Sequence, residues 1–304
     1  MKAAVYIKTK SGKLLDFQDF PRPVPKDNEV LLRVRAASVN PLDWRLKSHR
    51  PGVDVAGEVV SIGRAVTQFR LGDVVFGACR GAFAEYACAS EMKIVLKPET
   101  VTFEQAAAVP IAGLTALQGL RDKGNLQRGE KILINGAAGG IGTFAVQIAK
   151  SMGAIVTGVC STHNVDLVRS LGADRIIDYT REDFTQDSQR YDLLLDNVGN
   201  RSLSDMRRIL TPNGRSIMAG APKQMTAVIT RLLTASSRSL FARQKFRFFI
   251  ADLDRDDLTA LATLMKDGKV TPAIDRRYPL SEAANAIGYV EEGHARAKVV
   301  ITVR

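Results

Sequence analysis

The stretch KILINGAAGGIG, residues 131–142, constrains the fold of this chain more than any other. Residues 131–135 are apolar and rich in β-branched side chains, which predicts a short buried strand. Residues 136–142 are small, and residues 141–152 have the spacing of an amphipathic helix that ends at Gly153. A strand, a glycine loop and a helix in this order can hold phosphates, because small residues allow close approach and the helix start offers free N–H groups. A turn that only connects a strand to a helix is the alternative.

The segments after this loop decide between the two interpretations. Strand-like runs are predicted at 131–135, 155–160, 175–179, 191–197, 214–219 and about 246–251, with helices at 141–152, 164–171, 202–210 and within 225–243. Such alternation indicates a doubly wound parallel sheet, and six strands with a phosphate loop after the first are the Rossmann arrangement. The spacing is Ala137-x-Gly139-x-x-Gly142, with alanine in place of the usual first glycine. The predicted phosphate-binding residues are Ala138, Gly139, Gly140, Ile141 and Gly142.

The rest of the chain has a different pattern. Residues 1–98 contain short strand-like runs separated by proline and glycine turns, which predicts a compact β-rich, barrel-like domain. An alanine-rich helical region begins at Thr102 and is interrupted at Pro110, so two helices or one kinked helix are expected there. The six strands of the Rossmann sheet are complete before residue 252, so the segment beyond this residue is expected to return to the first domain. The predicted domains are therefore 1–112 with 253–304, and 113–252.

Net charge is the one unusual bulk property, at +11 for 304 residues. A basic chain can bind nucleic acid, an anionic membrane or a phosphate-bearing ligand. Lysine and arginine are scattered among acids here without a nucleic-acid motif, so solubility and the field around a cofactor are the favoured explanations. No apolar run approaches the roughly 20 residues that span a bilayer. The first residues read directly as a strand and the three cysteines show no pairing, which predicts a cytoplasmic protein.

The turn after the second predicted strand indicates which nicotinamide cofactor the loop would hold. An NAD site usually places a carboxylate there to bind the ribose hydroxyls. Here the strand is followed by Ser161, Thr162, His163 and Asn164, and the first carboxylate is Asp166. Hydroxyl and amide donors can solvate a 2′-phosphate that a carboxylate would repel, which favours NADPH. The same serine and threonine could also cap the next helix.

The fourth predicted strand ends in Asp196, Asn197 and Gly199. Ligands of doubly wound sheets lie at the carboxyl ends of the strands, so Asn197 and Gly199 are predicted near the nicotinamide half of the cofactor. An ordinary strand-to-helix turn is the alternative.

With these segments assembled, the chain resembles the zinc-independent, quinone oxidoreductase-like branch of the medium-chain dehydrogenase/reductase family. The resemblance extends over nearly the whole chain. It rests on NPLDWR (40–45), PGVDVAGEV (51–59), GDVVFG (72–77), VPIAGLTAL (109–117), NGAAGGIG (135–142), STHNVDLVRSLGADRIIDYT (161–180) and GHARAKVVI (293–301). It implies a GroES-like first domain, a Rossmann second domain and hydride delivery from NADPH in a cleft between them.

The resemblance also implies roles for single residues. Asn40 would lie near the nicotinamide, and Arg45 would contact cofactor or substrate. Thr115 would sit beside the cofactor phosphates. The positions that match holders of the 2′-phosphate are Ser161, Asn164 and Tyr179, and Lys298 joins the cofactor-binding set. Some relatives carry a lysine at the Asn164 position, which this chain lacks.

Zinc relatives of the superfamily carry a histidine ligand where this chain has Val53, and they add a four-cysteine lobe. A catalytic zinc needs three protein ligands, and the three histidines here are not in ligand spacing. We therefore expect no metal. The loop between NPLDWR and PGVDVAGEV is only LKSHR, shorter than in relatives, so the substrate side is expected to be more open or completed by another subunit.

Without zinc, an alcohol substrate lacks a Lewis acid, whereas a conjugated acceptor is already electrophilic. The expected reaction is therefore hydride transfer from NADPH to a quinone or to the β-carbon of an α,β-unsaturated carbonyl. Charge then develops on a carbonyl oxygen and needs donors, for which Asn40 and Arg45 are the candidates. Asp43 is interpreted as structural rather than as a general base. The alternative function is a nucleotide-binding regulatory or RNA-binding protein with little activity.

The segment 221–251 contains no acidic residue and carries six basic residues. Its apolar residues fall at helical spacing. A basic amphipathic helix can lie on an anionic membrane. Packing within the protein and a homodimer contact are the favoured interpretations, with peripheral membrane contact as the alternative.

Overall fold

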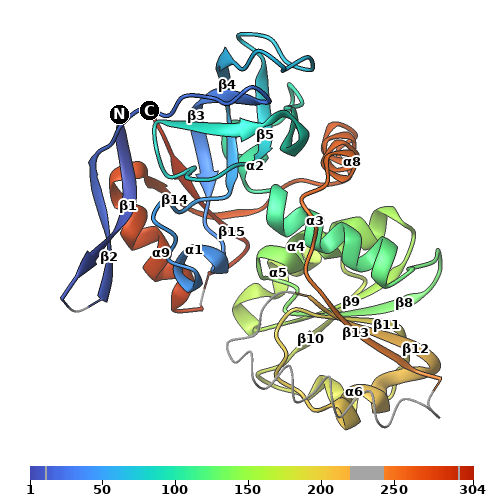
Figure 1. Cartoon of the computed structure of the whole chain (residues 1–304). Coiled ribbons are helices and arrows are strands. Elements are labelled where there is room, and N and C mark those ends of the chain that lie inside the picture. The colour runs from blue at the N-terminus through green and yellow to red at the C-terminus, as the bar shows by residue number, and fades with distance from the viewer. Residues whose placement is uncertain (11, 220–242, 294) are drawn as a thin grey trace. The chain divides into compact units, whose positions relative to one another are not determined.

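The computed structural model describes residues 1–10, 12–219, 243–293 and 295–304 (Figure 1). The chain divides into two compact units. The first unit comprises Met1–Leu114 with Leu253–Arg304, and the second is Thr115–Asp252. The helix predicted within 225–243 falls almost wholly outside the described residues.

The second unit contains a six-stranded parallel sheet with the order β10-β9-β8-β11-β12-β13. Its strands are β8 (Lys131–Asn135), β9 (Ile155–Cys160), β10 (Arg175–Asp178), β11 (Tyr191–Asp196), β12 (Leu210–Ala219) and β13 (Lys245–Phe249). The helices are α4 (Gly140–Ser151), α5 (Val165–Ser170) and α6 (Leu203–Ile209), with the π-helix η2 (Gly119–Lys123) and the short 3₁₀ helices η3 (Thr162–Asn164) and η4 (Phe184–Gln186). In Figure 1, α4 and α6 lie on opposite faces of the sheet. The predicted doubly wound Rossmann sheet is therefore confirmed.

The first unit is β-rich, as predicted. A seven-stranded sheet runs in the order β14-β15-β3-β4-β5-β7, with β6 paired to β3, and β1 and β2 form a separate hairpin. Its strands are β1 (Lys2–Thr9), β2 (Gly12–Asp19), β3 (Glu29–Ser38), β4 (Asp54–Ile62), β5 (Val74–Ala78), β6 (Tyr86–Ser90), β7 (Ile94–Leu96), β14 (Ile274–Pro279) and β15 (Lys298–Thr302). Its helices are α1 (Pro41–Arg45), α2 (Phe103–Ala107), α8 (Arg255–Lys266) and α9 (Ala283–Glu291), with η1 (Glu91–Lys93) and η6 (Leu280–Glu282).

The C-terminal segment returns to the first unit, as predicted, because β15 pairs antiparallel with β3. Two helices form around the proline interruption. Thr102 caps α2, accepting from the backbone N–H of Gln105 at 3.2 Å while the Gln105 side chain accepts from the Thr102 N–H at 3.0 Å. Pro110 is the first residue of α3 (Pro110–Gln118), where its missing N–H costs no helical bond. The strand β2 was not predicted.

Candidate functional site

The loop between β8 and α4 leaves a row of backbone amides without helical partners. The first i→i−4 bond of α4 runs from Thr143 N to Gly139 O at 3.0 Å, so the N–H groups of Gly140, Ile141 and Gly142 precede it. No side chain caps the helix at Gly139. These amides and the positive end of the helix dipole form a cradle suited to an anion.

The glycines of this cradle differ in what surrounds them. A Cβ at Gly142 would overlap Gly136 O and lie 2.7 Å from Ala137 Cα, so this position requires glycine for the fold itself. Among the described residues, a Cβ at Gly139 would meet only Gly136 O, at an ordinary 3.4 Å. No described residue therefore fills the space beside Gly139, as expected where a ligand approaches the backbone.

The turn after β9 presents polar groups that are not used for helix capping. Ser161 precedes η3 without a side-chain capping bond, so the capping interpretation is wrong for this residue. Instead Asn164 Nδ2 donates to Ser161 Oγ at 3.1 Å, and Asn164 Oδ1 is buried without a partner among the described residues. Tyr179, which follows β10, is 56% exposed. The Ser161 hydroxyl and the Asn164 amide oxygen therefore remain available to a ligand.

A carboxylate that was not predicted also lies at this turn. Asp178, the last residue of β10, accepts from Thr162 Oγ1 at 2.5 Å and from Thr180 N and Oγ1 at 3.0 and 2.7 Å. Arg181 Nε lies 3.5 Å from it. The hydrogen bond from Thr162 lowers the pKa of the Asp178 carboxyl. Parallel pairing of Asp178 with Cys160 is the signal that could have revealed this neighbour.

Unpartnered polar atoms gather at the carboxyl end of β11. Asp196 is fully buried, and its Oδ1 accepts from Asn135 Nδ2 at 2.9 Å and from the N–H groups of Val198 and Gly199 at 3.1 and 2.9 Å. Asp196 Oδ2 and both polar side-chain atoms of Asn197 are buried and have no partner in the described part of the chain. Buried polar groups normally have partners, so these atoms indicate a place for ligand or water. Thr115, in the second unit, is buried in α3.

A buried polar cluster forms in the first unit at the ends of β3, β4 and β15. Asp54, fully buried, accepts from Ser38 Oγ and Asn40 Nδ2 at 2.8 Å each and from Ile111 N at 3.0 Å. The Lys298 ammonium lies 3.6 Å from Asp54 Oδ2, and burial lowers its pKa. Each charge is stabilised here by fixed hydrogen bonds and by the opposite charge.

The two predicted donors differ in how they are held. Asn40 Nδ2 donates to Asp54 and, over a long 3.4 Å, to Ser38 O, while Asn40 Oδ1 accepts from Lys298 Nζ at 2.8 Å. Arg45 ends α1 and is exposed. Lys298 also donates to Val39 O at 3.3 Å, so its ammonium has two hydrogen bonds and the ion pair with Asp54. A cofactor contact from Lys298 would therefore require breaking one of these bonds.

Asp43 holds the start of α1 and the loop that follows it. Its carboxylate accepts from Asn40 N at 2.8 Å and from Gly52 N at 2.9 Å. Burial raises its pKa from the ordinary 3.8 to about 6. These bonds give Asp43 the structural role that was predicted for it. Among the described residues, no three His, Cys, Asp or Glu side chains are grouped closely enough to hold a metal ion.

Two family models match the chain, and together they include residues of both units. Residues 26–99 match the model of the alcohol dehydrogenase GroES-like domain, and residues 171–301 match that of the zinc-binding dehydrogenases. The chain is 34% identical to a chloroplast envelope quinone oxidoreductase homolog of Arabidopsis thaliana, covering 94% of this chain and 93% of the relative. The chain belongs to the medium-chain dehydrogenase/reductase superfamily, in its quinone oxidoreductase-like branch.

Other relatives agree with this assignment. A chloroplastic NADPH-dependent alkenal/one oxidoreductase of Arabidopsis thaliana is 32% identical, with 99% of this chain and 79% of the relative covered. The solved quinone oxidoreductase of Coxiella burnetii superposes with a TM-score of 0.86 at 30% identity, covering 100% of this chain and 99% of that one. The predicted pairing of a GroES-like domain with a Rossmann domain is thus confirmed. None of the helices in the described ranges has the length and apolar character needed to cross a membrane.

Proposed function

We propose that this member of the superfamily is an NADPH-dependent reductase that transfers hydride directly to a quinone or an α,β-unsaturated carbonyl, without zinc. The observation that carries the proposal is the amide cradle of α4, where no described residue fills the space beside Gly139. Relatives named as quinone and alkenal/one oxidoreductases support the substrate class.

The residues of the second unit fit a nicotinamide dinucleotide. The cradle amides would hold its pyrophosphate, with Thr115 beside it. The unpartnered atoms of Asn197, together with Gly199, would face its nicotinamide half. When bound, the reduced nicotinamide supplies a hydride.

Preference for NADPH is supported by the turn after β9. Ser161, Asn164 and Tyr179 would surround a 2′-phosphate with hydroxyl and amide groups. The nearby Asp178 carboxylate would disfavour this phosphate, but three hydrogen bonds from Thr162 and Thr180 already occupy it. Arg181, beside Asp178, adds a positive charge at the same turn.

Reduction of a conjugated acceptor places negative charge on a carbonyl oxygen, which donors in the site must stabilise. The exposed guanidinium of Arg45 can donate without breaking a buried bond of the Asp54 cluster. Asn40 can redirect the N–H that makes the long bond to Ser38, since its other bonds to Asp54 and Lys298 keep the amide in place. Water is proposed as the final proton source.

The test is oxidation of NADPH measured across a panel of quinones, enones and aldehydes, with the Gly139→Ala variant as the diagnostic change. The added methyl group meets only one ordinary contact among the described residues, so folding should be retained. It would fill the space assigned to the pyrophosphate, so NADPH affinity should fall at least tenfold. Unchanged NADPH affinity in Gly139→Ala, or failure of the natural protein to bind either nucleotide, would contradict the proposal. A homodimer is proposed as well, and light scattering would test it.

A further inference from the structure

A cavity of about 260 Å³ in the second unit is lined almost entirely by cationic side chains. Its lining residues are Lys123, Asn125, Arg215, Lys245 and Arg247. Lys245 is the first residue of β13, and Arg215 pairs with it on β12. The cavity therefore lies toward the amino end of β13, whereas the dinucleotide cradle follows the carboxyl end of β8. It is a separate place on the same unit.

The strand register concentrates positive charge at this cavity. Arg215 and Lys245 are direct partners across β12 and β13. Lys245 and Arg247 share one side of β13, because successive side chains of a strand alternate. Like charges opposite each other on neighbouring strands destabilise a sheet unless a counter-charge is present.

Little counter-charge is supplied by the protein itself. Glu130 binds Arg215 through two contacts of 3.0 and 2.5 Å, yet Arg215 Nε is buried and has no partner in the part of the chain that the structure describes. Across the described ranges, no ion pair joins Lys123, Lys245 or Arg247 to a carboxylate, and Arg247 donates only to Lys123 O at 3.3 Å. Around this small cavity, three cations therefore have no carboxylate within ion-pair distance among the described residues.

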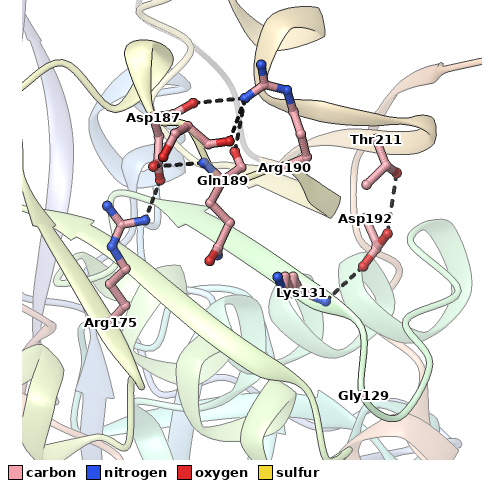
Figure 2. A pocket seen from close by; sticks show the side chains of 9 residues that line it. Gly129, Lys131, Arg175, Asp187, Gln189, Arg190, Asp192 and Thr211 are labelled. Carbon is pink, nitrogen blue, oxygen red and sulfur yellow. Dashed lines mark hydrogen bonds and ion pairs between the residues drawn. The ribbon is translucent and has the colours of Figure 1, made fainter.

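A second cavity of the same unit provides a useful contrast (Figure 2). It is larger, at about 810 Å³, and its lining includes Lys131, Arg175, Arg190, Asp187 and Asp192. Arg175 pairs with Asp187 at 2.6 Å, and Arg190 donates to backbone carbonyls of the same loop. Asp192 accepts from Lys131 N and Thr211 Oγ1. Its charges are largely satisfied internally, so a ligand there would have to displace existing bonds.

We propose that the cavity lined by Lys123, Arg215, Lys245 and Arg247 binds a compact oxyanion of the phosphoryl class. Two guanidinium groups offer planar pairs of donors that match phosphate oxygens, and two ammonium groups add point charges. The alternative role for cations on an edge strand is to prevent that strand from pairing with another chain. That explanation does not account for Arg215, which lies on the neighbouring inner strand and has an orphaned buried Nε.

The test is calorimetric titration of inorganic pyrophosphate into the full chain, with saturating NADPH present to occupy the cradle. The diagnostic variant is the double change Lys245→Gln and Arg247→Gln, which removes two uncompensated cations and leaves the Arg215–Glu130 pair intact. Loss of two charge-assisted contacts should weaken pyrophosphate binding by about tenfold or more. The matched control is Lys131→Gln, an exposed cation of the other cavity, which should change the affinity less than about twofold.

Charge-retaining replacements separate recognition from folding. Lys245→Arg with Arg247→Lys should bind pyrophosphate nearly as well as the natural chain. Equal affinity in the natural chain and the double glutamine variant would overturn the proposal, and so would an equal loss in Lys131→Gln. The comparison among variants does not depend on the reductase activity, so it can fail or succeed independently of that proposal.

The phosphoryl group could belong to a soluble compound or to a lipid headgroup, and vesicles distinguish the two. Phosphatidylcholine vesicles, plain or containing a phosphatidylinositol phosphate, would be sedimented with each variant. Partitioning that requires the phosphorylated lipid and is lost in the double glutamine variant assigns the site to a headgroup. Pyrophosphate binding without partitioning assigns it to a soluble ligand. Binding of RNA without binding of pyrophosphate would overturn the proposal.

Discussion

Replacing Asp43 with asparagine should change how the stability of the first unit depends on pH. Burial raises the pKa of Asp43 from 3.8 to about 6, so over this interval the folded state holds a proton that the unfolded state has released. Each pH unit of such a difference changes the free energy of unfolding by about 1.4 kcal/mol. The interval therefore corresponds to about 3 kcal/mol, and this contribution to stability is present below pH 3.8 and is lost as pH rises to about 6.

Asparagine cannot titrate, so the free energy of unfolding of the natural chain minus that of Asp43→Asn should fall by about 3 kcal/mol as pH rises through this interval. In the variant an amide NH2 group stands where one carboxylate oxygen accepted the N–H of Asn40 or Gly52. Loss of that hydrogen bond lowers the free energy of unfolding by an amount that does not depend on pH. Urea denaturation followed by fluorescence of Trp44 is the appropriate assay, because this residue is the only tryptophan and lies next to Asp43 in α1.

The sign of the effect distinguishes burial from ion pairing. Asp19 is exposed, and its hydrogen bond with Lys2 lowers its pKa, so its contribution to stability is lost as pH falls. For Asp19→Asn the difference from the natural chain should therefore change in the opposite direction and by less, since exposed pairs contribute little. A difference for Asp43→Asn that stays constant, or that grows with pH, would refute the burial argument.

Four further changes test other contacts. Asp54→Asn removes the charge beside buried Lys298 and should lower the free energy of unfolding, measured with denaturant, by about 3 kcal/mol or more. Without Asp54, Lys298 loses its proton more readily in the folded state. The difference in free energy of unfolding between the natural chain and Asp54→Asn should therefore narrow as pH rises toward about 10. Thr102→Ala removes the cap of α2 and should cost about 1 kcal/mol in the same assay. Asn164→Asp places a carboxylate 3.1 Å from the Ser161 hydroxyl, so fluorescence titration should show NADPH affinity falling about tenfold while NADH affinity is retained. Treatment with a chelator should leave the rate of NADPH oxidation unchanged, and a loss restored by zinc would contradict the metal-free proposal.

The second unit could be predicted in detail because its signals are local. The bounds of β8 and β9 agree with the sequence prediction residue for residue, since each is a short apolar run ended by glycine or polar residues. In contrast β2 was missed, because GKLLDFQD is exposed or half-buried along its length and has no alternating buried face. Its strand conformation comes from pairing with β1, which no periodicity within the segment could reveal.

The candidate site likewise combines residues that are adjacent in the sequence with residues that only the fold brings together. The amide cradle depends on a loop of consecutive residues and was predicted from them. The Asp178 carboxylate at the turn after β9 was not, because it arrives from the next strand and reaches Thr162 across 16 positions of sequence. Polar residues at the ends of parallel neighbours should therefore be considered together when cofactor preference is inferred.

The buried cluster around Asn40 depends on a contact between residues that lie far apart in the sequence. Lys298 reaches Asn40 across 258 positions, and it arrives through β15, which pairs with β3. An isolated buried ammonium or carboxylate would be too costly, so Lys298 and Asp54 are each tolerated in the core because the other is present. The C-terminal strand is thus part of the candidate site and not only part of the fold, since it supplies the charge that fixes Asp54, and Asp54 in turn orients the amide of Asn40.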